Sequence, residues 1–301
     1  MIYRACPPIN APIATEPVMS ENTTKTALSL ADLRNEIDRI DAQMHGLLIE
    51  RSEIIANLIA VKGTQESGSA FRPAREAAMM RKLVTRHRGI LPLDTVESIW
   101  RVIIATFTHV QAPYSVHADL TVGEAAMRDS ARFHFGFTVP FIAHMGAAGA
   151  IAAVARSKGD LALVPAVSVA SAGPWWGALE DPAAPKIIAR LPFVERPDHP
   201  ASLPVFAIAH PVTDAAAAEV EMHSLRVSGW SAAAARTLAP LAEVIAEPDG
   251  AFDGAALLIS VPQGQQVAAI TDALIKAGAS VRSSALVGNH ATRYTLAELK
   301  R

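Results

Sequence analysis

The feature that most constrains this chain is a long run of apolar residues at helical spacing near its N-terminus. Between Ser29 and Gly63, hydrophobic side chains recur every three or four residues, which predicts one amphipathic helix of about 30 residues or more. Ser29 is a suitable N-cap, and Asp32 follows in the first turn. Such a helix is about 45 Å long, more than one small domain can cover. Its apolar stripe therefore implies a coiled or dimeric partner, and we expect a homodimer.

Two more helices are predicted in the same part of the chain. Pro73 suits the first turn of a helix that ends near His87, and a third helix runs from about Asp94 to Gln111. Residues 63–69 read GTQESGS, which is typical of a flexible loop. The N-terminal part is therefore expected to be a three-helix, all-α domain.

The composition changes near residue 113. Residues 28–112 carry 21 charged side chains in 85 positions, whereas residues 113–301 carry 31 in 189. At roughly 150 residues per domain, a chain of this length holds more than one domain. We expect a multidomain chain with a disordered tail at 1–27, the all-α domain at 28–113 and two α/β segments at 114–218 and 219–301.

The second part alternates short β-like runs with Ala-rich helices, which predicts α/β layers. The last segment, from about Glu219 to Leu299, alternates in the manner of a ferredoxin-like fold. The expected strands are 161–169, 186–194, 203–210 and 255–261, and the expected helices between them are 146–157, 231–245 and 265–278.

Composition excludes several classes of function. A net charge of −2 leaves no broad basic surface for nucleic acid. The single cysteine, Cys6, excludes an intrachain disulfide framework and a cysteine-rich zinc module. The most apolar stretch, 137–155, is broken by Pro140 and Gly146, so we expect no membrane span. The ten histidines show no compact ligand spacing, so no metal site is expected. Residues 1–27 lack the pattern of a secretory signal, which favours the cytoplasm.

Cationic and polar residues of the helical part have a suggestive spacing. Arg51 and Lys62 are 11 positions apart, so they lie about 20° from one line on a helix and their Cα atoms are about 16 Å apart. Arg34 is about 100° from that face, so it could instead serve the site of a partner subunit. With Glu76 and Gln111, these residues could form a dicarboxylate site. The alternative is a solvated face of a long helix.

An ordered combination of motifs runs through residues 28–113: L-R-x-x-I-D-x-I-D at Leu33–Asp41, L-L-x-E-R at Leu47–Arg51 and R-P-x-R-E at Arg72–Glu76. A lysine near the end of the first helix and a glutamine at the end of the third complete it. In this combination, residues 28–113 closely resemble the all-helical, type II chorismate mutases.

The resemblance implies an intertwined dimer that converts chorismate into prephenate without cofactor or metal, in phenylalanine and tyrosine biosynthesis. It implies that Arg34 reaches into the partner's site and that Arg51 holds a substrate carboxylate. Lys62 and Gln111 would contact the ether oxygen, and Glu76 would contact the substrate hydroxyl.

This chemistry suits fixed cations. The rearrangement is pericyclic and unimolecular, so it needs no nucleophile or proton transfer. Positioning of the reactive conformer and stabilisation of charge on the ether oxygen accelerate it. The chain departs from some members of the family at Met79, Met80 and Phe107, where those members have polar or charged groups.

The second part weakly resembles the prephenate dehydratase region of the bifunctional P-proteins. The segment Gly159–Gly173 resembles the family's strand and V-P-x-E-N-S-like turn, but Ala166 and Val167 replace the acid and the amide. The T-R-F motif, expected near Pro204–Phe206, is absent. We therefore expect a dehydratase-like domain without dehydratase activity. The last segment resembles an ACT-type regulatory fold, although 262–267 is a poor match to its effector loop; an aromatic amino acid is the candidate effector.

Two other functions stay open from the sequence. One is a working bifunctional chorismate mutase/prephenate dehydratase. The other is a non-catalytic, ligand-sensing regulatory protein that uses the helical part for dimerisation. The joint presence of Arg34, Arg51, Lys62, Glu76 and Gln111 favours the enzyme, because a plain dimerisation helix does not need them together.

Overall fold

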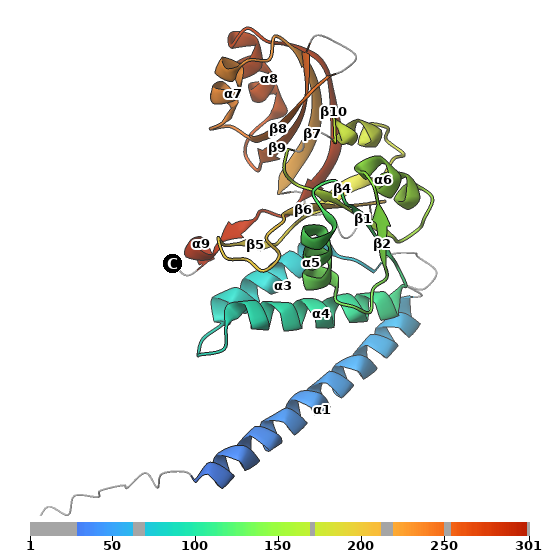
Figure 1. Ribbon diagram of the computed structural model, residues 1–301, viewed down its shortest axis with the longest axis vertical. Helices are drawn as coiled ribbons and strands as arrows, with labels where there is room; N and C mark the ends of the chain where they lie inside the picture. The colour runs from blue at the N-terminus through green and yellow to red at the C-terminus, as the bar shows by residue number, and fades with distance from the viewer. Residues whose placement is uncertain (1–28, 63–69, 169–171, 212–218, 250–253, 300–301) are drawn as a thin grey trace, which may run out of the picture. The chain divides into compact units, whose positions relative to one another are not determined.

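A computed structural model describes residues 29–62, 70–168, 172–211, 219–249 and 254–299 (Figure 1). The chain divides into two compact units, residues 1–51 and 52–301, and each is described by itself. The tail predicted at 1–27 and the loop predicted at 63–69 lie outside the described residues.

The first helix, α1 (Leu30–Lys62), confirms the prediction of one long helix. Ser29 caps it: the Ser29 hydroxyl accepts a hydrogen bond from the backbone N–H of Asp32, whose carboxylate accepts one from the backbone N–H of Ser29. A line of apolar residues with alternating steps of four and three positions runs along α1, and Arg51 occupies one position of that line. Seven of its members have exposed side chains: Leu33, Ile37, Ile40, Met44, Leu47, Ile54 and Val61.

Two helices follow, α3 (Pro73–Arg86) and α4 (Leu93–Gln111), close to their predicted bounds. Pro73 opens α3, where its missing N–H costs no helical hydrogen bond. The buried faces of α3 and α4 share one hydrophobic core with α5 (Glu124–Phe135) and with strands of the sheet. Figure 1 shows α3, α4 and α5 as neighbours beside the first strands.

A nine-stranded sheet runs in the order β2-β1-β3-β6-β4-β10-β7-β9-β8. In its first half, β1 lies between β2 and β3 and is parallel to both, and β6 is antiparallel to β3 and β4. One face of this half packs on α3, α4 and α5, and the other packs on α6 and the short helix η1. The elements of this half are β1 (Val116–Asp119), β2 (Phe141–His144), α6 (Ala147–Ala155), β3 (Leu161–Pro165), η1 (Trp175–Leu179), β4 (Lys186–Leu191) and β6 (Val205–Ala209).

The second half of the sheet has the order β-α-β-β-α-β, as expected for a ferredoxin-like fold. Its strands pair antiparallel, and its two helices share a separate core with the sheet. The elements are β7 (Val220–Ser228), α7 (Ala232–Leu238), β8 (Glu243–Pro248), β9 (Gly254–Pro262), α8 (Val267–Lys276) and β10 (Ser280–His290). Beyond the large sheet, β5 (Val194–Glu195) pairs with β11 (Tyr294–Thr295), and the short helix α9 (Leu296–Leu299) follows.

The two halves join where β10 lies parallel to β4 at Gly288 and Ile187. Gly288 has a φ of +149°, and a Cβ added there would lie 2.1 Å from the carbonyl oxygen of Ile187. Only glycine lets the two backbones approach this closely.

Several predicted elements need correction. The helix expected over 231–245 ends at Leu238, because Pro240 cannot continue it, and Glu243–Pro248 is strand β8 instead. The strand expected over 186–194 ends at Leu191, directly before Pro192. The sequence reasoning did not identify β1, α5, β2, β7 or β10.

Within the described part of the chain, no helix combines the length and the apolar character that a bilayer crossing requires.

Candidate functional site

Three of the five predicted site residues are carried by α1. Arg34 lies in its second turn and is exposed, Arg51 is partly buried, and Lys62 is the last residue of the helix. Arg34 and Arg51 belong to residues 1–51, whereas Lys62, Glu76 and Gln111 belong to residues 52–301. The single helix gives Arg51 and Lys62 the 11-residue helical separation on which the prediction rested.

Glu76 lies in the first turn of α3 and is only 4% exposed. Its Oε2 atom accepts a hydrogen bond of 2.7 Å from Nη1 of Arg101 on α4. Arg101 Nη2 also donates to the carbonyl oxygen of His134, at 3.1 Å. Burial and the negative charge of Glu76 raise the pKa of the nearby Tyr114 hydroxyl. Glu76 therefore forms a buried ion pair with the Arg101 guanidinium.

Gln111 is the last residue of α4 and is partly buried. Its Nε2 atom donates a 3.0 Å hydrogen bond to the carbonyl oxygen of Phe107, one turn earlier. Ten residues separate Arg101 from Gln111, a rise of about 15 Å along a helix. Glu76 thus contacts the middle of α4, while Gln111 lies at its end, and a single chain does not bring these two side chains together.

Three positions depart from the resembling family, and two of them are apolar because they pack in the core. Met80 is fully buried in the core shared by α3, α4 and α5, and Met79 is partly buried against it. Phe107 is partly buried on α4, one turn before Gln111. Met79 and Met80 therefore fill the core beside Glu76.

A second buried polar group on α4 was not identified from the sequence. Glu97 accepts hydrogen bonds from Arg196 Nη1 at 2.5 Å and from His199 Nε2 at 3.4 Å. Although burial opposes it, the hydrogen bond from His199 and the charge of Arg196 hold the pKa of Glu97 below its ordinary value. The signal was available, because Glu97 and Arg101 occupy the same helical face as the apolar residues Ile104 and Ala105.

Two of the histidines, which show no compact ligand spacing in the sequence, are in contact. His117 Nδ1 and His144 Nε2 are 2.9 Å apart, and His117 Nε2 lies 3.3 Å from Asp160. Burial, and then the neighbouring His117, lower the pKa of His144. Across the described ranges, His, Cys, Asp and Glu side chains form no group of three or more that could hold a metal ion.

Comparison with known proteins gives one match to a family model, Chorismate mutase type II, over residues 33–112. A curated relative from Neisseria gonorrhoeae, a bifunctional chorismate mutase/prephenate dehydratase, is 33% identical over 103 residues. That match spans 34% of this chain and only 27% of the relative's length.

Two solved structures show a remote likeness to the chain. One is described as GqqA, a novel type of quorum quenching acylase, with 16% identity and a TM-score of 0.39; the match covers 60% of this chain and 95% of that one. The other is prephenate dehydratase from Streptococcus mutans, with 15% identity and a TM-score of 0.37, covering 60% of this chain and 99% of that one.

Proposed function

We propose that this chain, whose residues 33–112 are a chorismate mutase type II domain, converts chorismate into prephenate. The domain indicates an isomerase. The observation that carries the proposal is that the matched range contains all five candidate residues: Arg34, Arg51, Lys62, Glu76 and Gln111.

The proposed mechanism is electrostatic and positional. Arg51 and Arg34 bind the substrate's carboxylates, while Lys62 and Gln111 donate hydrogen bonds to the ether oxygen as its bond to carbon breaks. Glu76 accepts a hydrogen bond from the substrate hydroxyl. Donors that are fixed before the reaction stabilise the developing charge without reorganisation.

We propose a homodimer as the active state. The exposed apolar line of α1 needs a cover, and a second copy of the helix has the matching pattern. Arg101, the partner of Glu76, lies about 15 Å from Gln111 along α4 within one chain, and a second copy can bring further groups to the site. In such a dimer, Arg34 would enter the site of the partner.

The test is consumption of chorismate by the full chain, with prephenate identified as the product. Replacing Lys62 by alanine removes one donor to the ether oxygen, which should lower kcat/KM about 10²–10³-fold. Lys276→Ala, an exposed lysine on α8, is the matched control and should leave turnover unchanged. Wild-type protein that leaves chorismate intact would contradict the proposal, as would a fully active Lys62→Ala variant.

We further propose that the second part forms no phenylpyruvate from prephenate. The family's T-R-F motif, expected near Pro204–Phe206 at the start of β6, is absent there, so the threonine that would assist loss of water is missing from this place. Incubation of the pure protein with prephenate tests this. Phenylpyruvate as a product would contradict this proposal. It would favour for this chain the bifunctional activity that the Neisseria relative is named for.

A further inference from the structure

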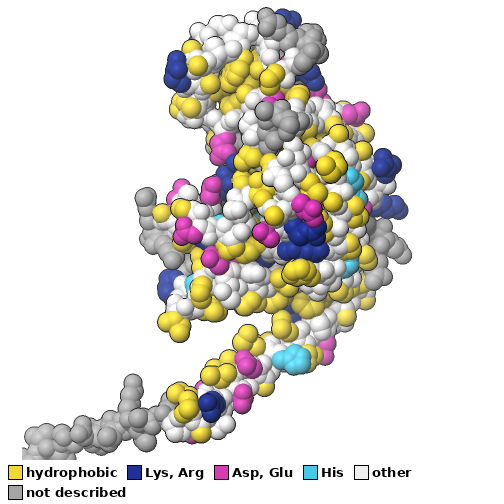
Figure 2. Space-filling model, in the orientation of Figure 1, with side chains coloured by type: hydrophobic (Ala, Val, Ile, Leu, Met, Phe, Trp, Pro, Cys, Tyr) yellow, Lys and Arg dark blue, Asp and Glu magenta, His cyan; other side chains and the backbone are white. Residues whose placement is uncertain are grey.

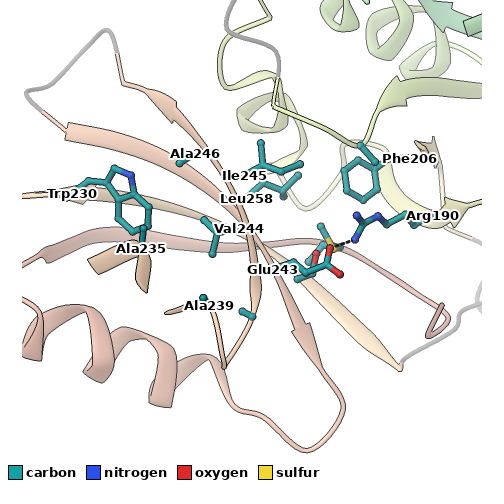
Figure 3. A pocket seen from close by; sticks show the side chains of 14 residues that line it. Arg190, Phe206, Trp230, Ala235, Ala239, Glu243, Val244, Ile245, Ala246 and Leu258 are labelled. Carbon is teal, nitrogen blue, oxygen red and sulfur yellow. Dashed lines mark hydrogen bonds and ion pairs between the residues drawn. The ribbon is translucent and has the colours of Figure 1, made fainter. Parts of the chain in front are cut away.

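A pocket of about 660 Å³ lies beside β8, in the second half of the sheet (Figure 3). This volume is within the range of small-molecule sites. Its wall is mostly apolar and comes from several elements, with Phe206 on β6, Met222 on β7, Ile245 on β8, Leu258 on β9 and Trp230 before α7. Such a wall suits a ligand with an apolar body.

Arg190 supplies the main positive charge of the pocket (Figure 3). Its side chain is only 11% exposed, and its guanidinium carbon lies 5.6 Å from the centre of the Phe206 ring. One end of the guanidinium is paired with Glu243. Its Nε atom is buried and has no hydrogen-bond partner within the described segments. The arginine therefore retains an unused donor inside the protein.

A smaller pocket of about 320 Å³ adjoins the first and shares Arg190, Glu243 and Ser260 with it. It adds Arg293, whose side chain is 10% exposed and lies 3.8 Å from Glu243 and 3.3 Å from Glu195. Burial lowers the pKa of His290, in the same wall, to about 4, so this imidazole is neutral at pH 7. Its Nε2 atom is buried without a partner among the residues described.

Glu243 pairs with Arg190 and lies near Arg293, but it is open to exchange. Its side chain is 63% exposed and belongs to β8, the edge strand of the sheet, so rotation into solvent costs the Glu243 carboxylate itself little. Rotation alone would leave the Arg190 guanidinium, about nine-tenths buried, without its counter-ion. A ligand carboxylate in the same place removes this cost, while Arg293 keeps Glu195 as its partner.

We propose that the pocket binds a small carboxylate with an apolar body, and that the ligand's carboxylate replaces Glu243 on Arg190. The apolar body packs against Phe206, Met222 and Leu258. Both halves of the sheet contribute, since Arg190 and Phe206 come from the first half and Glu243 and Leu258 from the second. The site is separate from residues 33–112, so it does not depend on the proposed mutase activity.

The first experiment compares two probes of one shape on the full chain by ligand-observed NMR and calorimetry. 3-Phenylpropionate carries the carboxylate, and 3-phenylpropan-1-ol replaces it by a neutral hydroxyl. We expect the acid to bind at least ten-fold more tightly. Equal affinities, or no binding of the acid, would overturn the proposal.

Variants then test the exchange with Glu243. Glu243→Gln removes the competing charge and should tighten binding of 3-phenylpropionate several-fold, whereas Arg190→Met should weaken it at least ten-fold. Glu124→Gln and Arg128→Met, an exposed pair on α5, are the matched controls and should leave the affinity unchanged. Because Glu243 is exposed, its variant stays informative even where Arg190→Met is poorly folded. Unchanged or weaker binding to Glu243→Gln would refute the exchange.

Discussion

Glu76 and Arg101 form an ion pair that is almost completely removed from water. The side chains are 5% and 1% exposed, and the guanidinium also binds a backbone carbonyl oxygen on α5. A buried charge that loses its partner keeps the full cost of its desolvation. The pair therefore fixes how α3, α4 and α5 pack, whatever Glu76 does with a substrate.

Arg101→Leu should lower the free energy of unfolding by about 3–5 kcal/mol, because it leaves Glu76 buried without its counter-ion. Urea denaturation of the purified variant measures this change. Arg236→Leu, an exposed arginine on α7, is the control and should change it by less than about 0.5 kcal/mol. Adding Glu76→Leu to Arg101→Leu should restore part of the loss, and a single variant as stable as wild type would contradict the argument.

Glu97 should make stability depend on pH on the acid side. Its pKa is depressed in the folded protein, so its stabilising contribution is present above the ordinary value of 4.5 and is lost as the pH falls through the folded pKa. Glu97→Gln should therefore be less stable at pH 7 and should show a smaller fall in stability below about pH 4.5. Thermal unfolding between pH 3 and pH 7 checks this, with Glu124→Gln as an exposed control. If stability changed with pH in the same way in Glu97→Gln and wild type, ionised Glu97 would not stabilise the fold.

The junction between the two halves of the sheet depends on Gly288. Gly288→Ala places a Cβ against the backbone of β4 and requires a φ that L-residues avoid, so β10 must move away. We expect a loss of about 2–4 kcal/mol in stability. Gly46→Ala, in α1 with open space around its Cα, should be neutral or slightly stabilising. Denaturant titration of both variants measures their free energies of unfolding. Similar values for the two variants would contradict the requirement for glycine at the junction.

The long elements were predictable and the short ones were not. The helix from Leu30 to Lys62 has many turns of apolar periodicity, and Ser29 and Pro73 mark helix starts by known backbone chemistry. The four-residue strands β1 and β2 are too short to show a period. The Ala-rich segment after Ser231 has high helix propensity on both sides of Pro240, which concealed β8.

The candidate site was predictable only in part. Spacing correctly placed Arg51 and Lys62 on one helix, because a helix fixes their separation. It could not show that Glu76 pairs with Arg101, since that contact depends on how two helices pack. The pocket around Arg190 has no local sequence pattern, because its walls come from five strands and from residues around α7.

At the scale of the whole molecule, Figure 2 shows hydrophobic side chains spaced along α1, with charged side chains between them. Residues at alternating steps of four and three positions form the seam of a coiled coil. These residues remain exposed in the single chain, so an isolated protomer would carry a large uncovered apolar surface.

Ile40→Asp should convert the proposed dimer into monomers and abolish mutase turnover, because it places a charge in the middle of the seam. Gln43→Asp, an exposed neighbour outside that line, has a similar cost in helix propensity and should stay dimeric. Analytical ultracentrifugation over a range of concentrations distinguishes the two. A monomeric wild-type protein, or a dimeric Ile40→Asp variant, would contradict the assembly.

The pairing of β4 with β10 has a consequence for how the protein is made. At Ile187 and Gly288, the two strands are separated by about 100 residues of chain, which a ribosome adds in roughly 5–20 s. During that time the unpaired N–H and C=O groups along β4 are a template for strands of other chains. Synthesis of this protein therefore depends on protecting the unpaired edge of β4 until β10 has been made. Slow translation or a shortage of chaperones should reduce its yield.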